Sequence, residues 1–219
     1  MSISMTDATR IRQETNLTAS NQYSHSIWVK PDDLSAVISF DRISFLNAVC
    51  LLDVNSSGDV RLRDNGAPVF STITASGALT TGVWSHIICS VTTTLATFMI
   101  DGTLIGTATV SVDPVQATGF HISENATGVG LIGEYERPMV WKFALSQQEM
   151  ITIYQSRNKT IPKFDNLIID WGLNVKEDGA TVVTDDVTNR ADPPNTESIV
   201  SGSPVYGSSG KLNSRKRYR

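Results

Sequence analysis

Two carboxylates lie at alternate positions in a stretch that reads as a strand. Glu134 and Glu136 occur in the run GEYER, and side chains two residues apart on a strand point to the same side. Carboxylates paired in this way act as acid and base, or as acid and nucleophile, in the cleavage of glycosidic bonds. After Arg137, the residues PMVW add no third carboxylate. We therefore expect that the protein is not an enzyme, and we assign no catalytic residue.

The histidines and cysteines show no spacing typical of a metal or nucleophile site. His25, His86 and His121 are far apart, and none belongs to an H-x-x-H or H-E-x-x-H motif. Cys50 and Cys89 both lie in hydrophobic strand patterns, and a disulfide scaffold would need more cysteines in a chain of this length. The sequence therefore predicts two buried free thiols and no resident cofactor.

Oxygen-bearing side chains gather in one polar stretch near the C-terminus. The stretch contains Asp185, Asp186, Asn189 and Asp192, which are the kinds of ligand that calcium prefers. Asp also caps turns in solvated loops, and this interpretation fits the stretch better. Calcium remains the alternative here, and we assign no metal ligand.

The last nine residues are strongly basic. They contain five cations and no acid: Lys211, Arg215, Lys216, Arg217 and Arg219. The rest of the chain holds 13 basic and 22 acidic residues, so an acidic body of net charge −9 carries a tail of +5. Such a tail is either solvated or seated on an acidic surface of a neighbouring protein. We predict that these five residues dock a partner protein, with nucleic acid the less favoured partner.

Length and composition favour one domain. A chain of 219 residues with 40% hydrophobic and 18% charged residues suits a single β-sandwich with terminal arms. No run reaches the roughly 18 apolar residues of a membrane helix. The opening residues, MSISMTDATRIRQ, lack the basic-then-apolar pattern of a secretory signal. We expect no export by that route and no membrane partner.

A β-hairpin is the clearest local element. Hydrophobic residues alternate from Ile87 to Val91 and again from Phe98 to Ile100, which is the period of a half-buried strand. Asp101-Gly102 tolerates positive φ at both central positions of a type I′ turn. The pattern predicts a hairpin over Thr97 to Val110.

A short helix follows later in the chain. Ser146 and Glu149 form a Ser-x-x-Glu capping box, in which each side chain satisfies a free backbone donor of the first turn. Met150, Ile153 and Tyr154 then share one face. We expect one helix over about residues 146–157.

These segments resemble the laminin G-like, concanavalin A-like jelly-roll domains. The resemblance rests on Trp84-x-His86 before the hairpin, on the Asp101-Gly102 turn, on SIWVKP at 26–31, on the turn-rich segment 56–66, and on the Gly-rich strand, aromatic strand and helix of 130–154. It implies an all-β, concanavalin A-like jelly-roll β-sandwich with one short helix and terminal arms. His86 then has a structural role.

The C-terminal segment resembles the opening of such domains. From Ile168 the chain gives a hydrophobic strand with Trp171-x-Leu173, an acidic-Gly turn at 177–179, a strand at 181–185 and Gly-x-Pro at 202–204. A circular permutation would place this segment in its own sandwich, whereas a strand swap would donate it to a neighbour. A truncated second repeat is weaker, because about 50 residues cannot bury a sandwich core.

The domain boundaries follow from this reading. We expect residues 1–18 to form an N-terminal arm or first strand and residues 19–205 to form the sandwich. Residues 166–205 complete or swap that sandwich, and 206–219 are the basic tail.

Sugar-binding members of the resembled family use exposed aromatic rings. All four tryptophans fall on landmarks that normally pack inside the sandwich or against its edge: Trp28, Trp84, Trp141 and Trp171. Three tyrosines remain as surface candidates: Tyr23, Tyr135 and Tyr206.

Two functions from different classes remain. Our main prediction is a non-catalytic virion structural protein of a bacterial virus, a capsid decoration, tail or fibre component made in the host cytoplasm. Its rigid sandwich and docking arms would bind other virion proteins and further copies of itself. The alternative is a lectin-like adhesion module that binds a surface glycan.

Overall fold

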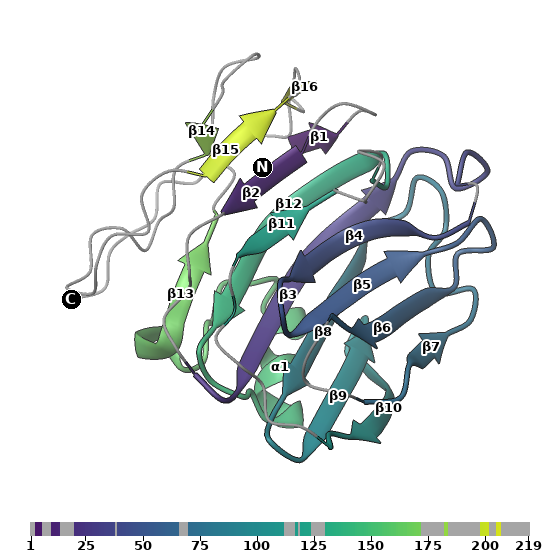
Figure 1. Ribbon diagram of the computed structural model, residues 1–219. Helices are drawn as coiled ribbons and strands as arrows, with labels where there is room; N and C mark the ends of the chain where they lie inside the picture. Colours follow the sequence, from purple (N-terminus) through teal and green to yellow (C-terminus); the bar gives the residue numbers. More distant parts are fainter. Residues whose placement is uncertain are drawn as a thin grey trace.

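The computed structural model describes residues 20–171, except 38, 66–69, 112–116, 118 and 124–129. Outside that range it describes only the strand residues 3–5, 10–13, 182–183, 198–201 and 205–206. Two antiparallel sheets face each other and enclose the main core (Figure 1). The expected all-β jelly-roll sandwich is confirmed.

The first sheet is built around a long central strand. Its order is β10 (Thr103–Thr109), β9 (Leu95–Ile100), β8 (Ser85–Val91), β3 (Tyr23–Pro31), β12 (Gly133–Trp141), β1 (Ile3–Met5) and β16 (Val205–Tyr206). A further strand, β13 (Leu167–Asp170), also pairs with β12.

The second sheet lies opposite. Its order is β14 (Val182–Val183), β15 (Ser198–Ser201), β2 (Arg10–Gln13), β11 (Phe120–Ile122), β4 (Asp41–Leu46), β5 (Cys50–Val54), β6 (Val60–Asp64) and β7 (Ile73–Ala75). The predicted turn-rich segment 56–66 forms the β5–β6 hairpin.

Alternation along β3 assigns its side chains to two different layers. Tyr23, Ile27 and Val29 belong to the core between the sheets. Trp28, one residue out of phase, lies on the outer face, because successive side chains of a strand point to opposite sides. Both faces of the strand are covered, so eight of its nine residues are buried.

A helix covers the outer face of the first sheet. α1 (Gln147–Gln155) lies behind that sheet in Figure 1, and a short 3-10 turn, η1 (Phe164–Asn166), precedes β13. Met150 and Ile153 of α1 pack with Met139 and Trp141 of β12 in a second hydrophobic cluster. Among the described residues, no helix is long and apolar enough to span a membrane.

The predicted hairpin is confirmed as β9 and β10. Asp101 and Gly102 have φ values of 49° and 74°, as a type I′ turn requires. The ring of Tyr154 lies directly on this turn. A Cβ on Gly102 would lie 2.5 Å from Tyr154 Cδ1, so glycine serves both the turn and the packing of the helix against it.

Strands from both ends of the chain join the sheets. β13 pairs with residues 139–141 of β12, and β1 pairs with residues 133–135 along the same edge. β16 pairs with β1, and β15 pairs with β2. Circular permutation and a strand swap with a neighbouring chain both stay predictions, as do the domain boundaries.

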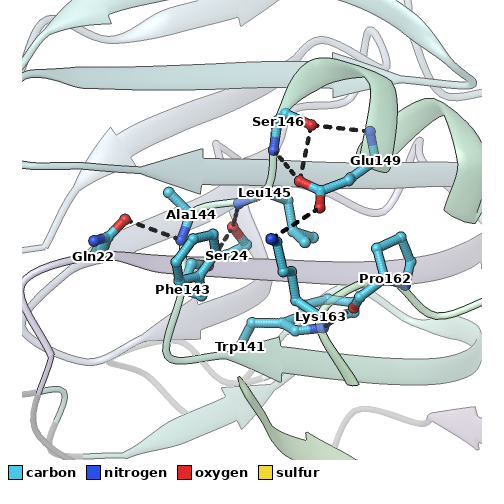
Figure 2. Close-up of polar contacts among 10 residues, drawn as sticks. All are labelled: Gln22, Ser24, Trp141, Phe143, Ala144, Leu145, Ser146, Glu149, Pro162 and Lys163. Carbon is cyan, nitrogen blue, oxygen red and sulfur yellow. Dashed lines mark hydrogen bonds and ion pairs between the residues drawn. The ribbon is translucent and has the colours of Figure 1, made fainter. Parts of the chain in front are cut away.

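The predicted capping box is present at the start of α1 (Figure 2). The Glu149 backbone N–H donates to Ser146 Oγ at 3.3 Å, and the Ser146 N–H donates to Glu149 Oε2 at 2.8 Å. Ser24 of β3 holds the preceding turn, because its Oγ accepts from the Leu145 N–H at 2.9 Å. The helix is therefore fixed to the sheet at its N-terminal end.

Removing the cap should weaken the domain measurably. We expect Ser146→Ala to lower the free energy of unfolding by about 1 kcal/mol, because the Glu149 backbone N–H loses its acceptor at the helix start. The measurement is urea denaturation followed by circular dichroism. Thr152→Ala, within the same helix and away from the cap, is the matched control and should be neutral or slightly stabilising, since alanine has the higher helix propensity. Equal losses in both variants would contradict the capping role.

Candidate functional site

A surface pocket of about 430 Å³ opens where the C-terminal end of α1 meets the first sheet. Its lining residues come from β3, from the start of β8, from the β9–β10 turn and from the helix: Trp28, Trp84, Asp101, Tyr154, Gln155 and Arg157. Three aromatic rings and three hydrogen-bonding side chains thus share one concave surface. This composition is typical of small-molecule sites, in which aromatic walls provide contact and a few polar groups fix orientation.

Stacked rings form the floor of the pocket. Trp28 is buried, and Tyr154 stacks on it with ring centroids 5.8 Å apart and an interplanar angle of 20°. The His86 ring contacts both, with its centroid 4.9 Å from that of Trp28 and 5.9 Å from that of Tyr154. Trp84 stays partly exposed, with Lys30 Nζ 5.7 Å from its ring centroid. The pocket therefore presents aromatic surface on a rigid base.

The His86 imidazole beneath the pocket is neutral. Burial lowers the pKa of His86 to about 3, because a charged imidazole would be cut off from water. Its Nε2 shares a hydrogen bond of 2.7 Å with Ser26 Oγ, and its backbone N–H donates to Asp101 Oδ1 at 2.7 Å. The second bond ties the turn of the pocket to β8. The structural role expected for His86 agrees with these contacts.

Arg157 occupies a backbone conformation that favours glycine. Its φ is 46°, at the position just after the C-cap Ser156, where the Arg157 N–H donates to the Tyr154 carbonyl. Glycine is the usual residue there, and other residues cost about 1 kcal/mol or more. The guanidinium carbon lies 4.6 Å from the Trp28 ring centroid, over the pocket floor. The strain thus places a cation at the pocket edge.

The two carboxylates considered for catalysis lie next to this region. Glu134 and Glu136 pair with Lys30 and Trp28 in the β12–β3 register, so they share the outer face as predicted. Glu134 forms an ion pair with Lys30, which neutralises it. The absence of catalysis stays a prediction.

The two cysteines and one histidine meet in the core. Cys89 Sγ lies 3.4 Å and Cys50 Sγ lies 3.6 Å from His25 Nδ1, and the two sulfurs are 3.9 Å apart. All three side chains are buried, and both thiols are free, as the sequence predicts. The hydrogen bond to Cys89 and burial raise the pKa of Cys50. Burial raises the pKa of Cys89 as well, but its hydrogen bond with Cys50 and the neighbouring His25 lower it to about 5.

Sequence spacing gave no sign of this cluster. The residues come from β3 and β8 of the first sheet and from β5 of the second, and only the folded sandwich brings them together. The prediction of no metal ligand stays a prediction, but sequence spacing did not indicate that His25, Cys50 and Cys89 converge. Each residue lies in phase with hydrophobic neighbours of its strand, which is the one available signal that the three share the interior.

A family model decides what kind of domain carries these features. The model of the concanavalin A-like lectin/glucanases superfamily, of the laminin G type, matches residues 4–150. The chain belongs to this superfamily. No curated protein sequence matches it.

Solved structures with the same fold include proteins of several kinds. A proposed carbohydrate-binding protein from Bacteroides ovatus has a TM-score of 0.69 at 14% identity, with 92% of this chain and 58% of that chain covered. The heptameric SAP-like pentraxin from Limulus polyphemus has a TM-score of 0.59 at 15% identity, covering 91% and 94%. The CBM40 module of Ruminococcus gnavus IT-sialidase, bound to α2,3-sialyllactose, has a TM-score of 0.54 at 15% identity, with 70% of this chain and 96% of that chain covered. Such distant likeness shows the fold alone.

Two predictions about aromatic residues in this superfamily member are wrong. Tyr23 and Tyr135 are buried in the core, because each lies in phase with the inward side chains of its strand. Their hydroxyls are satisfied inside, and Tyr135 donates to the Leu131 carbonyl at 2.7 Å. Trp28, Trp141 and Trp171 are buried, and Trp84 is partly exposed. Trp84 precedes β8, at the rim, where the sheet ends.

The other predicted site residues lie outside the described residues. These are the basic tail and the polar stretch: Lys211, Arg215, Lys216, Arg217, Arg219, Asp185, Asp186, Asn189 and Asp192. The side chain of Tyr206 is likewise not described. Partner docking and calcium binding by these residues stay predictions.

The buried His86 should make stability depend on pH. An unfolded histidine binds a proton near pH 6.5, whereas folded His86 does so only near pH 3. Between these values the unfolded state binds more protons, so stability falls as pH falls, by up to about 1.4 kcal/mol per pH unit from this residue.

A non-titrating variant isolates this contribution. We expect His86→Gln to be destabilised at pH 7 and to lose less stability than the wild type between pH 6.5 and 4. The measurement is the free energy of unfolding at each pH, from urea titrations. Parallel pH profiles for the two proteins would contradict the neutral, desolvated histidine.

Proposed function

We propose that the protein is a glycan-binding domain and that the pocket at the end of α1 holds the sugar. The observation that carries the proposal is a pocket lined by the partly exposed Trp84 ring, by Tyr154 and by three polar side chains. The lectin-like fold and the likeness to a proposed carbohydrate-binding protein and to a sialyllactose-bound module support it.

Sugar chemistry fits this combination of groups. A pyranose ring has a face of C–H groups that packs on an aromatic ring, while its hydroxyls leave the rim and need donors and acceptors. Trp84 and Tyr154 provide aromatic surface, and Gln155, Arg157 and Asp101 provide both kinds of hydrogen-bonding group. Each polar residue is at least partly exposed and can reach a ligand.

The strained arginine gives independent support. A residue kept in a glycine-type conformation costs stability, and such strain collects at functional sites. Here the left-handed backbone accompanies an Arg157 guanidinium that lies over the Trp28 ring and lines the pocket. Packing alone does not require this residue, because glycine would end the helix with less strain.

Binding fits the nearby charges better than hydrolysis. The Glu134 carboxylate is paired with Lys30, so a cation already neutralises the group that would have to give or take a proton. Neither Glu134 nor Glu136 lines the pocket. We therefore propose a binding role without catalysis.

The virion role stays a prediction. It rests on the terminal arms and the basic tail, which lie largely outside the described residues. A virion protein that attaches to a surface glycan would satisfy both readings, since the pocket and the arms are separate parts of the chain.

Trp84 provides the direct test. The wild type is screened against an array of neutral and sialylated oligosaccharides, and the best binder is titrated by isothermal calorimetry. We expect Trp84→Ala to weaken that binding about tenfold, because losing an aromatic contact costs about 1–1.5 kcal/mol. Phe164→Ala is the matched control, since that ring is 44% exposed and does not line the pocket. Equal affinity of Trp84→Ala and wild type, or no binding across the array, would overturn the proposal.

Arg157→Gly separates function from stability. The glycine removes the left-handed strain but also the contact with Trp28, which is worth about 0.5–1 kcal/mol. We expect the free energy of unfolding to stay within about 1 kcal/mol of wild type, while glycan affinity falls. A variant that is destabilised and still binds like the wild type would contradict the role given to Arg157.

A further inference from the structure

We infer that His25, Cys50 and Cys89 form an intersheet binding site for a thiophilic metal ion, Zn²⁺. Among the residues that the structure describes, this is the one group of three or more His, Cys, Asp and Glu side chains whose ligand atoms converge within 4.8 Å. The site lies in the core, separate from the proposed glycan pocket on the outer face of the first sheet.

The three distances between the ligand atoms match those around a tetrahedral zinc ion. Zinc bonds sulfur at about 2.3 Å and imidazole nitrogen at about 2.0 Å, so tetrahedral angles place two sulfurs about 3.8 Å apart and sulfur and nitrogen about 3.5 Å apart. The observed S–S distance is 3.9 Å, and the S–N distances are 3.4 and 3.6 Å. The ligands therefore need almost no movement to bind the ion.

The histidine is oriented as a metal ligand. Ser44 Oγ lies 3.2 Å from His25 Nε2, on the side of the ring away from the sulfurs. When Nε2–H donates to Ser44, Nδ1 carries the lone pair, on the side of the ring where both sulfurs lie. A second hydrogen bond of this kind fixes the tautomer and ring orientation of metal-bound histidines.

Donor type and charge select the ion. Two thiolates and an imidazole are soft ligands, which favour zinc or copper(I) and disfavour calcium and magnesium. Both cysteines bind the ion as thiolates, so Zn²⁺ with two thiolates and a neutral imidazole is uncharged. Copper(I) would leave one negative charge in the core, which is costly to bury. Charge balance therefore favours zinc.

A metal at this position would stabilise the sandwich by joining its two layers. His25 and Cys89 belong to β3 and β8 of the first sheet, and Cys50 belongs to β5 of the second. All three are buried, so the ion would enter as the chain folds. Zinc would then raise the free energy of unfolding.

Metal analysis of the full-length protein tests the site. The protein is produced with zinc in the medium, purified under reducing conditions and examined by elemental analysis and native mass spectrometry. We expect one zinc ion per chain and a lower denaturation midpoint when unfolding is measured with a chelator. Refolding with Co²⁺ should give the thiolate-to-cobalt charge-transfer absorption, which reports sulfur ligands directly.

Variants assign the ligands. Cys50→Ala and Cys89→Ala should each lose the zinc and the cobalt band, and alanine suits these sites because buried cysteine behaves as a small apolar residue. Ser90→Ala is the control, since Ser90 is buried on β8 next to Cys89 but outside the cluster. It should keep the metal.

Three results would overturn the inference. The first is a wild-type protein without bound metal whose two thiols react freely in denaturant. The second is a Cys50–Cys89 disulfide in the reduced preparation, seen as the loss of two hydrogens in the intact mass. The third is zinc that the cysteine variants retain. None of these results bears on glycan binding, so the two proposals stand or fall separately.

Discussion

The two covered faces of β3 are the constraint on which the rest of the structure depends. Its odd-numbered side chains from Tyr23 to Val29 face the second sheet, and its even-numbered ones face α1 and the pocket. A slip of one residue would exchange the faces, moving His25 out of the core and Trp28 into it. Either change would destabilise the fold, because both side chains are buried, His25 against the core cysteines and Trp28 against His86 and Tyr154. This register thus fixes the core cluster and the pocket floor together.

The local elements could be read from the sequence because their causes are local. Asp101-Gly102 supplies two positive φ values, and Ser146 with Glu149 supplies a reciprocal cap, so the hairpin and the helix start were predicted correctly. The buried cysteines followed from hydrophobic alternation. Each of these features needs information from only a few neighbouring residues.

The sites could not be read in the same way because they combine distant segments. Trp28, Trp84 and Arg157 meet only after α1 packs on the first sheet, and His25 meets the cysteines only across the sandwich. The burial of Tyr23 follows from its phase in the strand rather than from its residue type. Its alternation with Ile27 and Val29 already indicated the interior.

The arrangement of the terminal strands has a mechanical consequence. Ile3 of β1 lies opposite Tyr206 of β16, so the start of the first strand and the end of the last one leave the sheet on the same side. A force that pulls the two chain ends apart therefore loads this pair like a zipper, one hydrogen bond at a time, rather than in shear. The long β3–β12 and β3–β8 pairings carry no load until the terminal strands have peeled away. A tether at either end would thus strain the edge of the sandwich first, and leave the central strands, with the pocket they support, in place.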